Sequence, residues 1–153
     1  MKLGHCILVA GVISMSAAAV DAAPLAPTKA SQLVTVLAGA ETCNAGFGRV
    51  LNFLVQGDGS VAPLVLPEKS VLVVTAWEWC EGSNPSGAFV SLAIEGPGGL
   101  IAVSNVLREP LTPTCSRADL GQGVRVSSGA KLCATPVGAG ALVKAYGYLA
   151  KDK

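Results

Sequence analysis

Short apolar runs, separated by clusters of glycine, proline, asparagine and serine, follow one another along most of the chain. Within several runs apolar and polar residues alternate, which is typical of β-strands that bury one face. No run keeps apolar residues at helical spacing over three turns. The pattern therefore predicts strands over residues 32–37, 49–56, 60–66, 71–80, 88–95, 100–106, 124–127, 131–134 and 141–150.

Turn residues mark the boundaries between these runs. Glycine permits positive φ angles and proline fixes φ, so clusters of the two reverse the chain with little strain. Such clusters predict turns at residues 57–59, 82–87, 96–99, 121–123, 128–129 and 138–140.

Alternation also predicts which side chains share a face of the sheet, because residues two apart on a strand project to the same side. The run 49–56 is expected to carry on one face Leu51, Phe53 and Val55. The run 71–80 is expected to carry on one face Val73, Thr75, Trp77 and Trp79. The run 88–95 is expected to turn Ser91 and Glu95 to a polar face, away from Val90, Leu92 and Ile94.

The predicted fold is a small all-β antiparallel sandwich, jelly-roll-like, with about eight or nine short strands. An immunoglobulin-like sandwich is the alternative architecture. One domain is expected over residues 33–150, followed by a charged tail at residues 151–153. The chain has no internal repeat and no composition shift that would indicate a second domain.

The first 22 residues predict a cleavable secretory signal peptide. Lys2 supplies a positive start, residues 6–16 carry no charge, and residues 17–23 are mostly small. The apolar stretch is shorter than a bilayer span, so no stable membrane insertion is expected after cleavage. A Pro- and Ala-rich flexible leader is predicted for residues 23–32. The expected location is secreted or periplasmic.

Cysteine usage agrees with export. Cys6 lies in the predicted signal, and an even number of cysteines remains for disulfides in an oxidising compartment. We expect two disulfides, paired in sequence order as Cys43–Cys80 and Cys115–Cys133. Zinc is the competing interpretation, but no two cysteines are spaced as zinc ligands and no histidine accompanies them.

The amino-acid composition argues against several kinds of catalytic site, metal site and partner. The single histidine, His5, lies in the predicted signal, so the mature chain lacks the imidazole of common nucleophile and metal sites. A free catalytic thiol is not expected either, and we therefore predict no catalytic residue, no metal and no cofactor. The net charge is +1 without a block of like charge, which disfavours nucleic acid as a partner.

Four aromatic residues form the one constellation that suggests a binding site. Trp77 and Trp79 are two residues apart, and so are Tyr146 and Tyr148. If their strands belong to one sheet, the four rings are expected to form one aromatic patch bordered by Lys144. Such a patch would bind a glycan or a protein partner. The alternative is that the rings fill the core.

Three functional hypotheses follow. The first is an exported, non-catalytic binding module that recognises a glycan or protein through a sheet face. The second is a structural or adhesive, pilin-like subunit, in which residues 23–37 complete the sheet of a neighbouring subunit by strand addition. The third is a secreted inhibitor or a histidine-free hydrolase, which would need two carboxyl groups across a cleft.

Two short segments resemble small exported bacterial β-sandwich proteins that have no assigned role. They are residues 66–75 (LPEKSVLVVT) and residues 147–149 (GYL). The resemblance carries no catalytic motif, so no functional residue follows from it.

Overall fold

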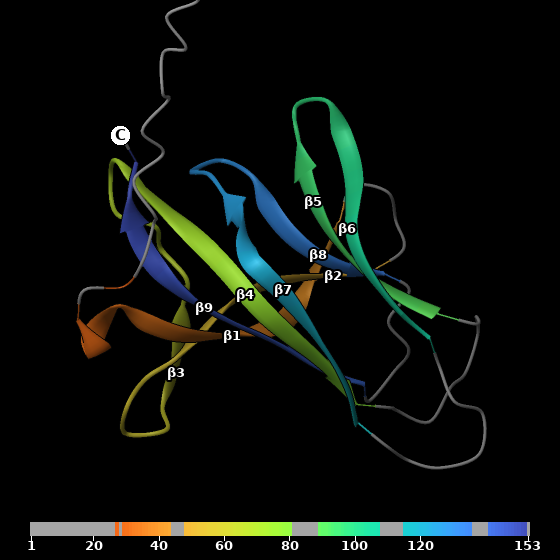
Figure 1. Ribbon diagram of the computed structural model, residues 1–153, viewed down its shortest axis with the longest axis horizontal. Coiled ribbons are helices and arrows are strands. Elements are labelled where there is room, and N and C mark those ends of the chain that lie inside the picture. The colour runs from red at the N-terminus through yellow and green to blue at the C-terminus, as the bar shows by residue number, and fades with distance from the viewer. Residues whose placement is uncertain are drawn as a thin grey trace, which may run out of the picture.

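The structure is a computed structural model that describes residues 27, 29–43, 48–80, 89–107, 115–135 and 141–152. The predicted signal peptide lies outside these residues, as does most of the segment 23–28. Figure 1 shows the arrangement of the described elements, which are one short 3₁₀ helix and nine strands: η1 (Ala30–Gln32), β1 (Leu33–Thr42), β2 (Arg49–Val55), β3 (Val61–Pro63), β4 (Ser70–Cys80), β5 (Phe89–Gly96), β6 (Gly99–Leu107), β7 (Cys115–Val126), β8 (Lys131–Thr135) and β9 (Leu142–Lys151).

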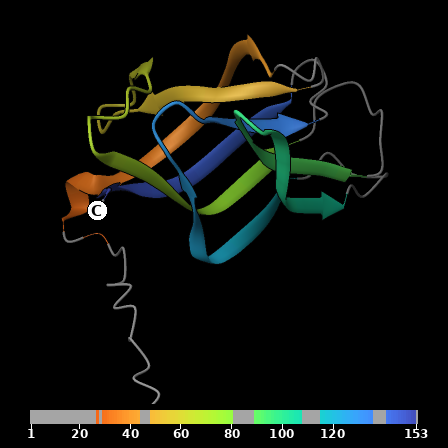
Figure 2. The ribbon, with the colours of Figure 1, turned by 90° about the horizontal axis from the view of Figure 1, so that it is seen from above.

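All nine strands pair antiparallel in one continuous sheet. The order is β6-β5-β8-β2-β1-β9-β4-β7, with β3 paired to β2 as a short addition. The sheet curls around a common interior, which is visible from above in Figure 2, and its terminal strands β6 and β7 come close together. The prediction of a small antiparallel all-β domain with two disulfides is confirmed, and its opposing layers are two halves of one nearly closed sheet.

Strand β7 is longer than predicted. It begins at Cys115, and the predicted turn at residues 121–123 lies inside it. Gly121 and Gly123 have φ angles of 59° and 91°, which glycine adopts readily. The register passes from Val124 opposite Val74 to Asp119 opposite Ala76, so residues 120–123 bulge out of the ladder. Gly121 and Gly123 therefore form part of a bulge and do not reverse the chain.

Two further bulges reverse the predicted faces of β2 and β4. Thr75 has no partner in the β4–β9 register, where Val74 faces Gly147 and Ala76 faces Tyr146. A Cβ atom added at Gly147 would overlap the carbonyl oxygen of Val73, so glycine permits this close approach. As a result, the interior cluster that holds Trp77 and Trp79 takes Leu72 and Val74 from β4, while Val73 packs outside it. The expected face with Val73 and Thr75 is wrong.

In β2 the unpaired residue is Asn52. Leu51 lies opposite Ala38, and Phe53 lies opposite Leu37. Cross-strand partners share a face, so Phe53 lies on the Leu37 face while Leu51 is buried in the interior. The expected common face for Leu51, Phe53 and Val55 is therefore wrong for the same reason as in β4.

The main hydrophobic core fills the interior of the curled sheet. Its buried members come from seven strands and are Val36, Leu51, Leu72, Val74, Trp77, Trp79, Val90, Leu92, Val126, Leu132, Ala134, Val143 and Ala145. The convex side also buries residues: one cluster contains Val71, Val73, Tyr148 and Ala150, and another contains Cys43, Val50, Ala93 and Cys133. Ser91 and Glu95 do point away from the main core, but both are buried.

The disulfides join Cys43 to Cys133 and Cys80 to Cys115, so the predicted sequential pairing is wrong. Sheet order explains the difference. Cys80 and Cys115 stand opposite each other in the β4–β7 ladder. Cys133 lies in β8 opposite Val50 of β2, beside the end of β1 that leads into Cys43. The first bond therefore encloses the second along the chain.

The two disulfides are appropriate to an oxidising, extracytoplasmic environment. Among the described residues, no helix has the length and apolar character needed to cross a membrane.

Candidate functional site

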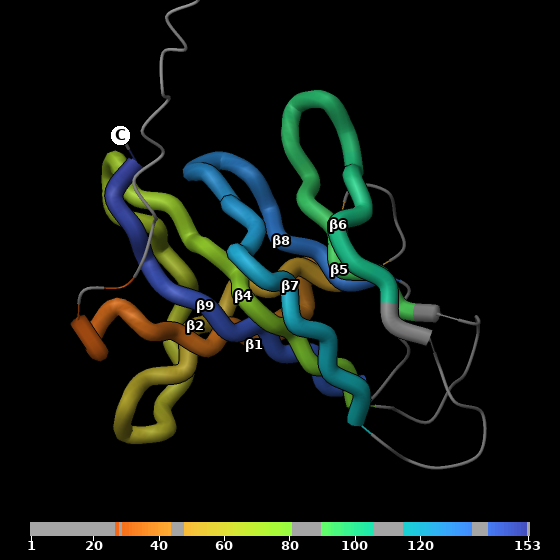
Figure 3. Tube along the Cα trace, in the orientation of Figure 1, coloured from red at the N-terminus to blue at the C-terminus, as the bar shows by residue number. Residues whose placement is uncertain are grey.

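A cavity of about 320 Å³ lies at the end of the curled sheet where β4 and β8 begin and β7 ends. Its size is at the lower end of the range for small-molecule sites, which often occupy the mouths of β-barrels. Figure 3 shows the β3–β4 connection and the β7–β8 turn at this end of the molecule. The lining residues are Glu41, Val50, Leu51, Asn52, Leu64, Val65, Leu66, Leu72, Val126, Ser128, Gly129, Ala130, Lys131 and Leu132.

The inner wall of the cavity is the exposed end of the main core. Leu51, Leu72, Val126 and Leu132 belong to that core and are almost fully buried. The curled sheet is not filled completely at this end, because these side chains leave the space that the cavity occupies. A ligand entering it would therefore contact an apolar surface that is already formed.

The β3–β4 connection forms the outer wall. The sequence Pro63-Leu64-Val65-Leu66-Pro67 alternates, so Leu64 and Leu66 pack against the core while Val65 is 77% exposed. The backbone N–H of Leu64 donates a 2.7 Å hydrogen bond to the carbonyl oxygen of Asn52. This hydrogen bond anchors the wall to Asn52, which is the bulged residue of β2 and has no partner in β1.

The β7–β8 turn forms the remaining edge. The backbone N–H of Ala130 donates to the carbonyl oxygen of Ser127 at 3.1 Å, and Gly129 has a φ angle of 85°. This combination is typical of a turn that needs glycine at its third position. It places Ser128 and Lys131 at the edge of the cavity.

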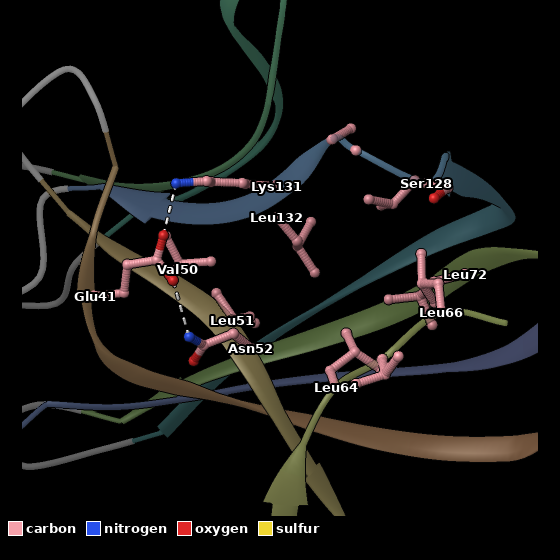
Figure 4. A pocket seen from close by; sticks show the side chains of 14 residues that line it. Glu41, Val50, Leu51, Asn52, Leu64, Leu66, Leu72, Ser128, Lys131 and Leu132 are labelled. Carbon is pink, nitrogen blue, oxygen red and sulfur yellow. Dashed lines mark hydrogen bonds and ion pairs between the residues drawn. The ribbon is translucent and has the colours of Figure 1, made fainter. Parts of the chain in front are cut away.

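Polar side chains gather on one side of the cavity. The Lys131 ammonium donates to a Glu41 oxygen at 2.6 Å, and the Asn52 amide donates to the other oxygen at 3.1 Å. Figure 4 shows these three side chains together, with Leu64, Leu66 and Leu72 on the opposite side. The cavity is therefore amphipathic: an ion pair faces a wall of leucines.

The ion pair changes the protonation of both partners. The hydrogen bond from Lys131 and its positive charge lower the pKa of the Glu41 carboxyl. The hydrogen bond to Glu41 raises the pKa of Lys131, with further attraction from Glu41 and from Glu95, which stands opposite Lys131 in the β5–β8 ladder. Both side chains are about half exposed, so opening the pair requires little free energy.

The structure does not bring the four predicted aromatic residues into one patch. In the β4–β9 ladder Trp77 faces Ala145 and Trp79 faces Val143, and both indoles lie in the main core. Tyr146 faces Ala76, and Tyr148 faces Val73 on the convex side. The expected common face is wrong, because the bulge at Thr75 shifts the alternation of β4 against that of β9.

Burial excludes three of these rings as contact surfaces. Trp77 is fully buried, and Trp79 and Tyr148 are less than a tenth exposed. The Trp77 indole N–H donates to the hydroxyl of Ser104 in β6 at 3.0 Å, which links β4 to the far edge of the sheet across the interior. These aromatics stabilise the fold.

Tyr146 is the exception, since it is partly exposed within a polar cluster. Its hydroxyl donates to Glu78 at 3.0 Å, and the Arg117 guanidinium lies 5.1 Å from its ring centroid. Lys144 stands opposite Glu78 in the β4–β9 ladder, and Asp119 pairs with Arg117 at 3.4 Å. Each charge in this cluster therefore has an opposite charge beside it.

Tyr146 gives a pH-dependent prediction. Burial raises the pKa of its hydroxyl, and the hydrogen bond to Glu78 raises it further. Because the unfolded side chain ionises first, near pH 10, its contribution to stability is complete below that pH and is lost as the pH rises through the folded pKa. We expect the tyrosinate absorbance of the folded protein to include a late-ionising component that Tyr146→Phe removes. Persistence of the late-ionising component in that variant would contradict the assignment.

The described residues include one group with potential metal-ligand atoms, Glu78, Cys80 and Cys115. Both sulfurs are joined in a disulfide, so neither is available as the thiolate that binds zinc. The hydrolase hypothesis needs two carboxyl groups across a cleft, and two of the chain's acidic residues, Glu81 and Glu109, lie outside the described residues.

Comparison with known proteins gives no match among family models, curated proteins or solved structures. The cavity is therefore the feature from which a function is inferred. Sequence reasoning missed its three hydrogen-bonded polar side chains, Glu41, Asn52 and Lys131, because they are far apart in the chain and form no motif. The sequence feature that could have indicated the cavity is the apolar pair Leu64 and Leu66, which lies between two prolines directly after the three-residue strand β3.

Proposed function

We propose that this chain is an exported, non-catalytic binding protein that takes a small amphipathic molecule into the cavity at the end of its sheet. The observation that carries the proposal is the division of the cavity into an apolar side and a side with one ion pair. The apolar part of a ligand would contact Leu51, Leu72 and Leu132, and its polar part would lie beside Glu41 and Lys131. The predicted signal peptide and the two disulfides support action in the periplasm or outside the cell.

The position of β1 disfavours the pilin-like alternative. That hypothesis requires residues 23–37 to pair with a neighbouring subunit. In the structure Leu33–Leu37 pairs with β9, and Thr35–Leu37 also pairs with β2 on the other side. Donation of this segment would break two ladders of its own sheet, which makes the binding protein the better supported hypothesis.

Binding of a neutral amphipathic probe tests the proposal. We expect 2-phenylethanol to bind the wild-type protein, as measured by saturation-transfer NMR, because its ring can enter the cavity while its hydroxyl remains at the rim. Ser128→Trp should abolish this binding, because the exposed Ser128 lies in a turn at the cavity edge and a bulky ring there would block entry.

The control is Ser60→Trp, which adds the same ring at an exposed site outside the cavity. It should leave binding unchanged. Equal saturation transfer in the wild type and in Ser128→Trp would show that the probe binds elsewhere and would refute the proposal.

A further inference from the structure

The ion pair at the cavity rim also restricts the charge of the ligand. Glu41 and Lys131 are the only charged residues that line the cavity within the described part of the chain, and they carry opposite charges. A ligand with one charge would be attracted by one partner and repelled by the other. A ligand that carries both charges close together would be attracted by both partners, provided that the ion pair opens.

The geometry allows the pair to open. Glu41 is the last residue but one of β1, Lys131 begins β8, and both side chains are about half exposed. The Asn52 amide would still hold Glu41 through its second oxygen, and Glu95 would still attract Lys131 across the β5–β8 ladder. Each charged group therefore keeps one neighbour when it turns toward a ligand.

We propose that the ligand is a small zwitterion with an apolar side group, that is, a free apolar α-amino acid. Its ammonium group would bind Glu41, its carboxylate would bind Lys131, and its side chain would enter the leucine-lined part of the cavity. This inference rests on the proposed function and names the ligand class of the same site. The cavity volume of about 320 Å³ is suited to a ligand of this size.

Four probes that share one ring separate the contributions of charge. They are phenylalanine as the zwitterion, 3-phenylpropionate as the anion, 2-phenylethylamine as the cation and 2-phenylethanol as the neutral form. We expect phenylalanine to bind about fivefold more tightly than each of the other three, since it gains two partly exposed ion pairs and loses one. Dissociation constants would be measured by NMR titration of the full mature chain.

Substitution of each charge locates the effect. Glu41→Gln should remove the advantage of phenylalanine over 3-phenylpropionate, and Lys131→Gln should remove its advantage over 2-phenylethylamine, because each variant leaves one charged partner that either probe can use. Glu41→Gln should also favour 3-phenylpropionate, because Lys131 then lacks its partner. The matched controls are Asp119→Asn and Arg117→Gln, which remove the same charges from an exposed ion pair outside the cavity and should change nothing.

The outcomes distinguish the two proposals. The zwitterion inference is wrong, while the binding function stands, if phenylalanine binds no more tightly than 2-phenylethanol to the wild type. It is also wrong if phenylalanine keeps its advantage over 3-phenylpropionate in Glu41→Gln and over 2-phenylethylamine in Lys131→Gln. If none of the four probes binds the wild-type protein, the cavity is not a site for such molecules and both proposals fail.

Discussion

Replacement of Cys43 and Cys133 by alanine should lower the free energy of unfolding by about 4–5 kcal/mol. The disulfide joins residues 90 positions apart, and a longer loop removes more entropy from the unfolded chain. Both cysteines are almost fully buried with Val50 and Ala93, so their loss also weakens packing. Because domains of this kind are stable by only about 5–15 kcal/mol, much of the stability would be lost. Urea denaturation of the oxidised variant and wild type measures the difference.

The second disulfide provides the comparison. Cys80 and Cys115 are only 35 positions apart, and both lie nearer the surface. Cys80→Ala with Cys115→Ala should therefore cost about 3–4 kcal/mol, less than the first pair. A larger loss in this second variant would contradict the account, and peptide mapping that linked Cys43 to Cys80 would contradict the connectivity itself.

Trp77→Ala should lower the free energy of unfolding by about 3–5 kcal/mol, because it leaves a large cavity in the centre of the core. Trp77 has the largest of the fully buried side chains, and its hydrogen bond to Ser104 links β4 with β6 across the interior. Its loss removes packing and leaves the Ser104 hydroxyl without that donor. Thermal or urea unfolding followed by circular dichroism measures the change.

A matched pair of milder substitutions separates the hydrogen bond from the packing. Trp77→Phe removes an indole N–H that donates to Ser104, while Trp79→Phe removes one that has no acceptor among the described residues. We expect Trp77→Phe to cost about 1 kcal/mol more than Trp79→Phe. Equal losses would show that the Trp77–Ser104 hydrogen bond contributes nothing to stability.

The hydrophobic pattern was sufficient to place most of the strands. The alternating runs and the glycine and proline clusters located eight of them but only the end of β7, because local backbone preference and the burial of one face depend on neighbouring residues. The pattern could not show bulges at Asn52 and Thr75, since a bulge depends on the register between strands that are distant in sequence. Each bulge shifts the alternation by one residue and so reverses the predicted face.

The order of the strands in the sheet could not be predicted from the sequence either. Pairing of Cys80 with Cys115 follows from the contact of β4 with β7, and pairing of Cys43 with Cys133 follows from the contact of β2 with β8. Neither contact joins consecutive strands. Sequential disulfides would have required Cys43 to approach β4, which lies two strands away from β1 in the sheet.

The residues of the candidate site could not be predicted from the sequence either, because they are brought together by the sheet order. Glu41 and Lys131 are 90 positions apart and meet because β1 and β8 both flank β2. The predicted aromatic site is wrong because the bulky side chains of Trp77 and Trp79 fill the main core. The charged rim and the apolar wall become a site only when the curled sheet brings them to one end.

Mapping of ligand contacts by methyl NMR tests the binding function most directly. On titration with 2-phenylethanol, we expect the largest chemical-shift changes at the methyl groups of Leu51, Leu64, Leu72 and Leu132, which line the cavity. The methyl groups of Val71, on the convex side, should not move. Shifts at Val71, or none at the cavity leucines at saturating probe, would contradict the account.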